Sequence, residues 1–376
     1  MKIKDFAIER YFAKYEFETE YLLSCSDCDG FSMEYLLSLA SPGEKRYWNN
    51  LKLGYTDTKG SKLLRDAIAR HYHTIGHDNI VVSSPGEANF ILMNLLLEKG
   101  DNVVCMAPAY QSLYQVAESI GCSISFWEAE KCPDWYYDPE KLKELITPET
   151  KLIIVNFPHN PTGFVPEKTE WEMIVETAGK NGVVLFSDEM YRGLAHGHAE
   201  EITPACDLYE NGVSLWGMSK SFGLAGLRTG WLACPNTKLL NEVEAFKDYL
   251  SICGSPLNEI LSAIALNNSK KFITPNLEKI ERNIQIFRQF HQRNRWFCDF
   301  PEPVGGSTAF VRILIKEPAM EFAEKLVRET GIMVLPSETF NYGNKHIRIG
   351  FGRENFPEVL DKFEKYIRGK IRQHPE

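Results

Sequence analysis

Between residues 79 and 235 the chain repeats one pattern: a short continuous run of apolar residues, a turn of small and polar residues, and a stretch with apolar positions at helical spacing. Continuous apolar runs are typical of strands in a sheet that helices cover on both faces. The last run, Thr229–Cys234, follows its predecessor closely and is expected to be its antiparallel neighbour. The pattern predicts an α/β domain built on a mostly parallel sheet.

The rest of the chain predicts two further parts. Residues 1–40 begin with a charged and aromatic stretch, which is more typical of an arm than of a domain. From residue 281 onward, predicted strands and helices alternate once more, which indicates a second and smaller α/β unit. We therefore expect an arm (1–40) that packs on a small domain (281–376), with a large cofactor-binding domain (41–280) between them.

Composition narrows the function classes. The chain has 376 residues and a formal net charge of -9, with 44% hydrophobic and 25% charged residues. It has no basic block for a nucleic-acid or membrane surface, and no apolar run of the roughly 18 residues that a membrane helix needs. We expect a cytoplasmic protein without a metal site. The pair Cys25 and Cys28 lacks the second pair of a zinc site, so a redox pair is the alternative.

The central candidate is Lys220, which lies in a turn of small residues directly after the apolar run that begins at Val213. An amine at the end of a buried strand is poorly hydrated, which favours its neutral and nucleophilic form. Such a lysine forms a Schiff base with an aldehyde such as pyridoxal phosphate. The alternative is a lysine that extends from a loop into solvent.

Polar residues at other strand ends match the requirements of that cofactor, because ligands collect at the carboxyl ends of parallel strands. The turn Gly86–Glu87–Ala88 offers backbone amides to a phosphate, and Arg228 offers a bidentate cation. Asp188 is placed to keep a pyridine nitrogen protonated. The alternatives are an ordinary loop for the turn and a helix cap for Asp188.

Four further residues complete the candidate set. Asn160 and Tyr191 lie on neighbouring turns and can donate to the phenolic oxygen of the cofactor. Tyr110 is placed to stack on its ring, although a rim tyrosine is an equal alternative. Arg348 is flanked by strand residues that would hold it rigidly against the α-carboxylate of a substrate; the alternative is a surface arginine on an edge strand.

Three motifs carry a resemblance to a known enzyme family: Asn160–Pro–Thr–Gly163, Asp188–Glu–Met–Tyr191, and Ser219–Lys220 with Arg228 eight positions after the lysine. The sequence resembles the fold-type I pyridoxal-phosphate enzymes of the class I/II aminotransferase family. The resemblance runs from about residue 50 to residue 351, in the order of the family. It implies Lys220 as the catalytic Schiff-base lysine, Asn160 and Arg348 as substrate-binding residues, and a cofactor-binding set of Tyr55, Gly86, Glu87, Ala88, Tyr110, Asn160, Asp188, Tyr191, Ser219, Lys220 and Arg228.

The resemblance also implies a homodimer with shared sites, because Tyr55 matches a tyrosine that reaches the phosphate of the neighbouring subunit. Two positions depart from the pattern. Gly217 stands where the family often has a serine that contacts phosphate, and Glu87 puts a carboxylate where small residues are usual. We find no second arginine for the distal carboxylate of an acidic substrate.

The function we expect is transamination between an L-amino acid and a 2-oxo acid, with Lys220 as general acid and base. A carbon–sulfur β-lyase or a cyclising enzyme with the same residues is the alternative, since all of them begin by removing the α-proton. A cofactor-binding transcription regulator would need a basic N-terminal domain, which the chain lacks. Aromatic residues near the site either favour an apolar substrate or serve only in packing: Phe31, Tyr110, Tyr114 and Tyr342.

Overall fold

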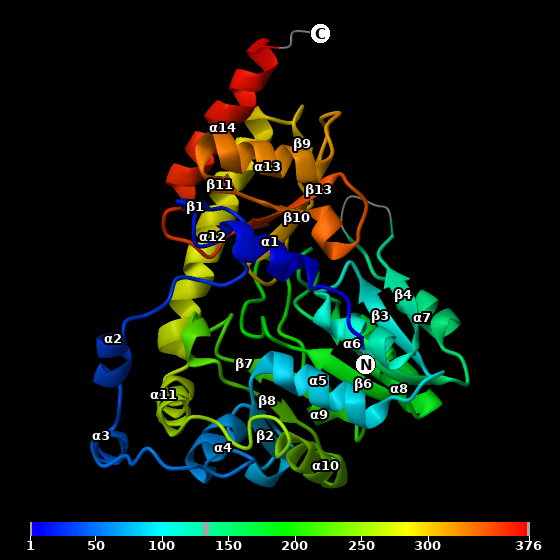
Figure 1. Ribbon diagram of the computed structural model, residues 1–376, viewed down its shortest axis with the longest axis vertical. Helices are drawn as coiled ribbons and strands as arrows, with labels where there is room; N and C mark the ends of the chain where they lie inside the picture. Colours follow the sequence, from blue (N-terminus) through cyan, green and yellow to red (C-terminus); the bar gives the residue numbers. More distant parts are fainter. Residues whose placement is uncertain (1, 131–134, 374–376) are drawn as a thin grey trace.

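The computed structural model describes residues 2–130 and 135–373, and it contains two main sheets that a long helix, α12 (Lys270–Arg293), connects (Figure 1). Near the start of α12, Phe272 packs in the core of the larger unit. Near its end, Phe290 packs against Phe363 of the smaller unit. The division of the chain at residues 40 and 280 stays a prediction; residue 280 falls inside α12.

The larger sheet has seven strands in the order β2-β8-β7-β6-β5-β3-β4, and all run parallel except β8. The predicted mostly parallel sheet and its antiparallel final strand are therefore confirmed. The strands are β2 (Ile80–Ser83), β3 (Asn102–Ala107), β4 (Ser123–Glu128), β5 (Thr150–Asn156), β6 (Val184–Asp188), β7 (Gly212–Gly217) and β8 (Gly230–Ala233).

Helices cover both faces of this sheet, because each strand presents apolar residues in both directions. In β8, Leu232 belongs to one buried cluster and Trp231 to the other. One face carries α5 (Pro85–Leu96), α6 (Ser112–Ile120) and α10 (Thr237–Lys247). The other carries α4 (Lys62–Ala69), α7 (Pro139–Leu145), α8 (Lys168–Asn181), α9 (Ala205–Leu208) and α11 (Pro256–Asn267).

The smaller unit is an antiparallel sheet in the order β12-β13-β10-β9, and the N-terminal segment joins it through a parallel pair, β1 with β11. Its elements are β9 (Cys298–Asp299), β10 (Thr308–Ile313), β11 (Ile332–Met333), β12 (Leu335–Pro336), β13 (His346–Gly350), α13 (Ala319–Thr330) and α14 (Phe356–Gln373). Within the described ranges, no helix has both the length and the apolar character needed to cross a bilayer.

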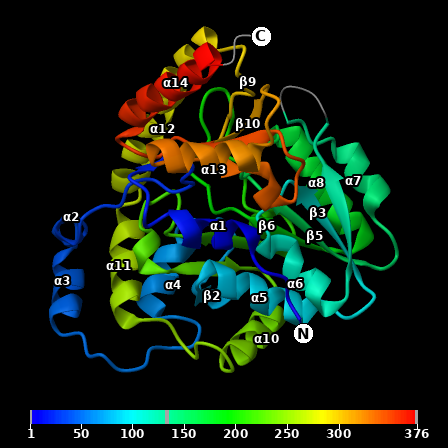
Figure 2. The ribbon, with the colours of Figure 1, turned by 45° about the horizontal axis from the view of Figure 1, so that its top comes forward.

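Three short helices lie in the first fifty residues: α1 (Ala7–Tyr15), α2 (Met33–Ser38) and α3 (Pro42–Asn49). Three 3-10 turns complete the chain: η1 (His77–Asn79), η2 (Ala225–Leu227) and η3 (Ser337–Phe340). Figure 2 shows α1 lying between α13 of the smaller unit and the larger sheet. The segment after β1 continues along β13, where the Gly350 N–H donates to the Leu23 carbonyl at 2.8 Å.

This contact yields a stability prediction. A Cβ atom on Gly350 would lie 1.8 Å from the Cys25 carbonyl oxygen, so Gly350→Ala must push the N-terminal segment away from β13. We expect the substitution to lower the free energy of unfolding by about 2–3 kcal/mol, the usual cost of overpacking. Urea unfolding followed by circular dichroism measures this change.

Gly369 provides the matched control, because it is an exposed glycine within α14 and a Cβ atom there meets nothing within 4 Å. Gly369→Ala is expected to be neutral or to stabilise by about 0.5–1 kcal/mol, through its higher helix propensity. Equal effects of the two substitutions would contradict the packing of the N-terminal segment on β13.

Candidate active site

Lys220 lies just beyond the carboxyl end of β7, and its Nζ donates a hydrogen bond to the Ser26 Oγ at 2.9 Å. The side chain is partly buried rather than extended into solvent. The preceding glycine, Gly217, is fixed by the close approach of β8: a Cβ atom there would lie 2.8 Å from the Thr229 carbonyl oxygen. A serine therefore does not fit at this position, which explains the first departure from the motif.

Asp188 ends the neighbouring strand β6 and is buried. Burial raises the pKa of the Asp188 carboxyl to about 7; the Met190 N–H and the charge of Lys220 act to lower it, and the charge of Glu189 to raise it. Lys220 and Asp188 are thus close enough for their charges to interact. A buried carboxylate that ionises with difficulty is suited to a cationic ligand atom, such as a protonated ring nitrogen.

Arg348, in the middle of β13, is completely buried. Its Nε and Nη2 donate to the Ser24 carbonyl at 3.1 and 2.8 Å, and its Nη1 donates to the Asn160 Oδ1 at 3.1 Å. None of the carboxylates in the described ranges forms an ion pair with Arg348, so its charge is met only by neutral oxygens. A buried guanidinium in this state is suited to an anion such as an α-carboxylate.

The turn after β5 links Arg348 to Asp188. The Asn160 N–H donates to the Asn156 Oδ1, and the Asn156 Nδ2 donates to the Asp188 carbonyl, both at 2.8 Å. The Asn160 Oδ1 accepts from Arg348, which orients the side-chain amide and leaves its Nδ2 as a donor for a ligand. The Tyr191 hydroxyl is also buried and forms no hydrogen bond with any described residue, as expected for a donor that a ligand would satisfy.

The predicted phosphate-binding turn is the start of α5. The Ala88 N–H donates to the Ser84 carbonyl and the Glu87 N–H to the Ser84 Oγ, so both amides are engaged within the helix cap. Gly86 is exposed, and a Cβ atom on it would meet nothing within 4 Å. The Glu87 carboxylate accepts from the Ser83 hydroxyl at 2.7 Å.

The remaining predicted residues differ in their placement. Ser219 is buried beside Lys220. Arg228 is exposed, adopts a left-handed backbone with φ 48°, and donates to the Ala225 carbonyl. Tyr110 donates its hydroxyl to the Glu9 Oε1 at 2.6 Å. The structure does not bring Tyr55 to the site of its own chain, since its side chain is 90% exposed in the loop before α4.

The four aromatic residues considered for substrate recognition all pack on other rings. Phe31 stacks on Tyr35, Tyr114 meets Phe126 edge-on, and Tyr342 packs against Trp135. Tyr110 packs on Phe6, and its hydroxyl donates to the Glu9 carboxylate. The structure therefore gives little support to an aromatic substrate pocket.

Sequence reasoning missed the N-terminal contribution to the site. Ser24 binds Arg348 through its carbonyl and Ser26 binds Lys220 through its hydroxyl, and neither gives a signal in a loop without periodicity. The neighbouring thiols of Cys25 and Cys28 are buried and unpaired, and burial raises the pKa of Cys28 to about 12. No three described His, Cys, Asp or Glu side chains are grouped to hold a metal ion.

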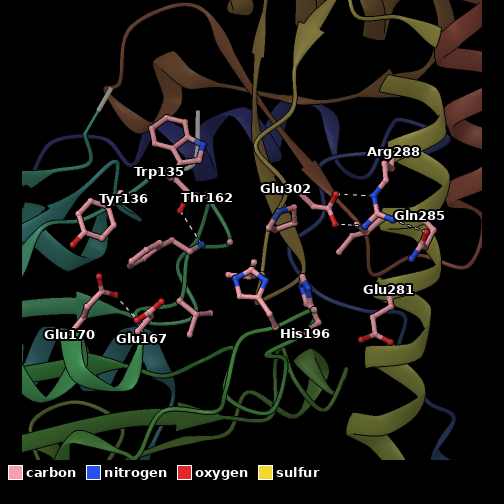
Figure 3. Close-up of a pocket in the computed structure, with 18 residues that line it drawn as sticks. Trp135, Tyr136, Thr162, Glu167, Glu170, His196, Glu281, Gln285, Arg288 and Glu302 are labelled. Carbon is pink, nitrogen blue, oxygen red and sulfur yellow. Dashed lines mark hydrogen bonds and ion pairs between the residues drawn. The ribbon is translucent and has the colours of Figure 1, made fainter. Parts of the chain in front are cut away.

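A separate cavity of about 740 Å³ is bordered by Thr162 and Gly163 of the turn after β5 (Figure 3). His196 also lines it, as do Glu302 and Arg288, which form two hydrogen bonds with each other. None of the predicted site residues lines this cavity. The residues suited to the cofactor instead meet at the carboxyl ends of β5, β6 and β7.

The chain was compared with known proteins. Residues 42–363 match the family model "Aminotransferase class I and II". The capreomycidine synthase of Streptomyces vinaceus is 31% identical over 78% of this chain and 75% of its own. An aspartate aminotransferase of Thermococcus kodakarensis is 28% identical over 82% and 79%. The crystal structure of a PLP-dependent aminotransferase from Streptococcus suis superposes with a TM-score of 0.91 at 27% identity, covering all of both chains.

These matches agree with the geometry of the site. Lys220, the buried Asp188 and the unpartnered phenol of Tyr191 lie at or just beyond the carboxyl ends of neighbouring strands, where this family binds pyridoxal phosphate. The chain therefore belongs to the class I and II aminotransferases, with their fold-type I architecture and their pyridoxal phosphate cofactor.

Proposed function

We propose that the enzyme moves the amino group of an L-amino acid to a 2-oxo acid, and that Lys220, Asp188 and Arg348 carry the reaction. The observation behind this proposal is their proximity: the charge of the Lys220 amine acts on the buried Asp188, and hydrogen bonds through Asn160 and Asn156 connect Asp188 to the buried guanidinium of Arg348. Pyridoxal phosphate, when bound, supplies an aldehyde that captures amines and a ring that accepts the electrons of the broken Cα–H bond.

The remaining chemistry falls to side chains of this chain. Arg348 holds the substrate α-carboxylate and thereby fixes the position of Cα, with Asn160 orienting the guanidinium. Lys220 would take the proton from Cα as general base and return it, as general acid, on the carbon of the former aldehyde at the far side of the substrate nitrogen. The Ser26 hydroxyl accepts a hydrogen bond from the Lys220 Nζ and thereby orients the amine.

The same geometry supports a set of residues that would hold the cofactor. Asp188 would stabilise the protonated ring nitrogen, while Asn160 Nδ2 and the unpartnered Tyr191 hydroxyl would donate to the phenolic oxygen. Tyr110, whose hydroxyl donates to Glu9, would cover the ring. The Gly86 amide at the start of α5 and Arg228 would hold the phosphate, with Glu87, Ala88 and Ser219 beside it.

A second function is favoured by one comparison. A relative 31% identical to this chain bears the name capreomycidine synthase rather than aminotransferase. The same lysine can start an elimination or a cyclisation, because each begins with loss of the Cα proton. The two routes differ in one respect: transamination needs a 2-oxo acid acceptor, whereas elimination or cyclisation proceeds without one.

We predict that the purified enzyme consumes an L-amino acid only when 2-oxoglutarate, pyruvate or another 2-oxo acid is supplied, and that Lys220→Ala lowers turnover by at least about 10³-fold, since it removes the general acid and base. Mass spectrometry of both products measures the transfer. Lys180→Ala, an exposed lysine paired with Glu176 on α8, is the matched control and should retain full activity.

Two results would contradict this assignment. Product formation from the amino acid alone, without an acceptor, would establish the elimination or cyclisation route. Undiminished turnover by Lys220→Ala would remove the lysine from the mechanism altogether.

The raised pKa of Asp188 gives a prediction about pH. An unfolded aspartate titrates near 3.8 and the folded one near 7, so the folded protein binds this proton more tightly and loses stability as pH rises through that window. We expect cofactor-free Asp188→Asn to be more stable than the wild type at pH 8, by up to about 4 kcal/mol, with the gap closing toward pH 4. The variant should nevertheless lose transfer activity.

Urea unfolding of the cofactor-free proteins at pH 5, 6.5 and 8 provides the measurement. If Asp188→Asn were the less stable protein at pH 8, the ionised carboxylate would already have a partner in the free enzyme, and its proposed pairing with the cofactor would lose its basis.

We also propose a homodimer in which Tyr55 of each subunit reaches the phosphate bound by the other. The loop that carries Tyr55 and the connection between α10 and α11 expose large apolar side chains: Leu53 79%, Tyr55 90%, Tyr249 89%, Leu250 45% and Ile252 47%. Apolar side chains gathered in this way support a protein–protein interface. A cytoplasmic location is part of the same proposal, and the unpaired thiols support a reducing compartment.

Tyr55→Phe is expected to raise the dissociation constant of pyridoxal phosphate by about 10–100-fold, the usual worth of a hydrogen bond to a charged group. Tyr249→Phe is the matched control, since Tyr249 is equally exposed. Fluorescence titration of cofactor-free protein measures both, and light scattering gives the mass of the particle. A monomer, or equal effects from the two substitutions, would contradict the shared site.

A further inference from the structure

The N-terminal helix α1 presents two different faces. Ile8 and Tyr11 are buried, and α1 packs on η3 of the smaller unit. Glu9, Phe12 and the C-cap residue Glu16 recur at intervals of three and four, so they share one face, which lies beside the buried face, and all three are partly buried. We call these three residues the acidic face of α1. Figure 2 shows the helix lying over the larger sheet, on the side of the smaller unit.

Contacts place the acidic face at the active site. The Glu9 carboxylate accepts from the Tyr110 hydroxyl, and the Phe12 ring lies 5.9 Å from the guanidinium carbon of Arg348. Burial raises the pKa of Glu16; the charges of Asp27 and Glu9 raise it further, while those of Arg353 and Lys220 lower it. The face thus runs from Tyr110 past Arg348, and Glu16 follows Phe12 by one helical turn, at a place where the charge of Lys220 acts on it.

Most charged residues at the site have a partner. As proposed above, Asp188 would pair with the ring nitrogen of the cofactor, Arg228 with its phosphate, and Arg348 with the α-carboxylate of the substrate. Asp27 is held by Arg353 at 3.0 Å. Within the part of the chain that the structure describes, Glu9 and Glu16 form no ion pair. Two partly buried carboxylates therefore remain without an ion pair of their own, one of them joined to Tyr110 and the other close enough for the charge of Lys220 to act on it.

We propose that the acidic face binds a positively charged substrate side chain, so that the amino donor is a basic amino acid carrying a terminal ammonium or guanidinium group. This inference rests on the proposed function, because Arg348 must hold the α-carboxylate for the side chain to extend toward α1. Glu16 is the specificity-determining residue, since Glu9 already holds Tyr110. The Phe12 ring covers the aliphatic part of the side chain and offers its face to the cation.

The same arrangement discriminates against acidic donors. A second carboxylate on the substrate would approach Glu9 and Glu16, and like charges at close range repel. Arg353, whose charge acts on Glu16, is already paired with Asp27 and Asp29 and is not available to an acidic side chain. A neutral donor would leave the Glu16 charge partly buried without compensation.

The test measures side-chain recognition without catalysis. Isothermal titration calorimetry of the holoenzyme compares 5-guanidinopentanoate, which has a carboxylate and a guanidinium but no α-amine, with hexanoate, which lacks the cation. We expect the guanidino acid to bind about 10–100-fold more tightly, in line with a charge-assisted hydrogen bond. Glu16→Gln should remove most of this preference and Glu16→Asp should retain it. Glu18→Gln, an exposed neighbour of the same helix end, should leave it unchanged.

A donor panel completes the experiment. The ratio of kcat/KM for L-ornithine, L-lysine and L-arginine to that for L-norleucine should exceed about tenfold in the wild type and fall by a similar factor in Glu16→Gln. Equal binding of the two acids, or an unchanged ratio in the variant, would overturn the assignment while leaving transamination intact. Absence of transfer from every donor would instead contradict the proposed function itself.

Discussion

The buried guanidinium of Arg348 is the constraint around which the site is arranged. Removing a charge from water is costly unless hydrogen bonds replace the lost hydration, and Arg348 obtains them from the Ser24 carbonyl and the Asn160 side chain. These two partners belong to the N-terminal segment and to a turn of the larger sheet, while Arg348 itself belongs to the smaller sheet. One side chain thereby joins three separate parts of the chain at the proposed substrate site.

This arrangement separates the charges of the site. At the strand ends of the larger sheet, Lys220 lies near the buried Asp188, which is suited to a cationic ring. Arg348, in the smaller sheet, is suited to a carboxylate. One face of α1 carries Glu9 and Glu16, which form no ion pair within the described ranges. A bound cofactor and the proposed basic substrate would supply the opposite charge at each of these places.

The sequence predicted those features that are local in the chain. The strand of Asp188, the turn of Asn160 and the lysine at the end of β7 each follow a continuous apolar run, so each could be placed at a strand end without knowledge of its neighbours. The strand Ser123–Glu128 was not predicted, because it lies at the sheet edge with only Trp127 fully buried and therefore has no continuous apolar run. Gly217 was noticed only as a departure, whereas the reason for it is the approach of β8.

Contacts between distant segments could not be predicted in this way. Ser24 and Arg348 are separated by 324 positions and joined through a backbone carbonyl, which carries no sequence signal at all. Glu9 meets Tyr110 across 101 positions. Ser26, which binds Lys220, lies between Cys25 and Cys28, and the sequence pattern of that pair indicated only a possible redox site.

The most direct test of the account is to identify the lysine that binds the cofactor aldehyde. Borohydride reduction of the holoenzyme, followed by proteolysis and mass spectrometry of the peptides, fixes the cofactor to the lysine that holds it. The account predicts a single phosphopyridoxyl group on Lys220. A label on another lysine, or a protein that takes up no label after incubation with pyridoxal phosphate, would contradict it.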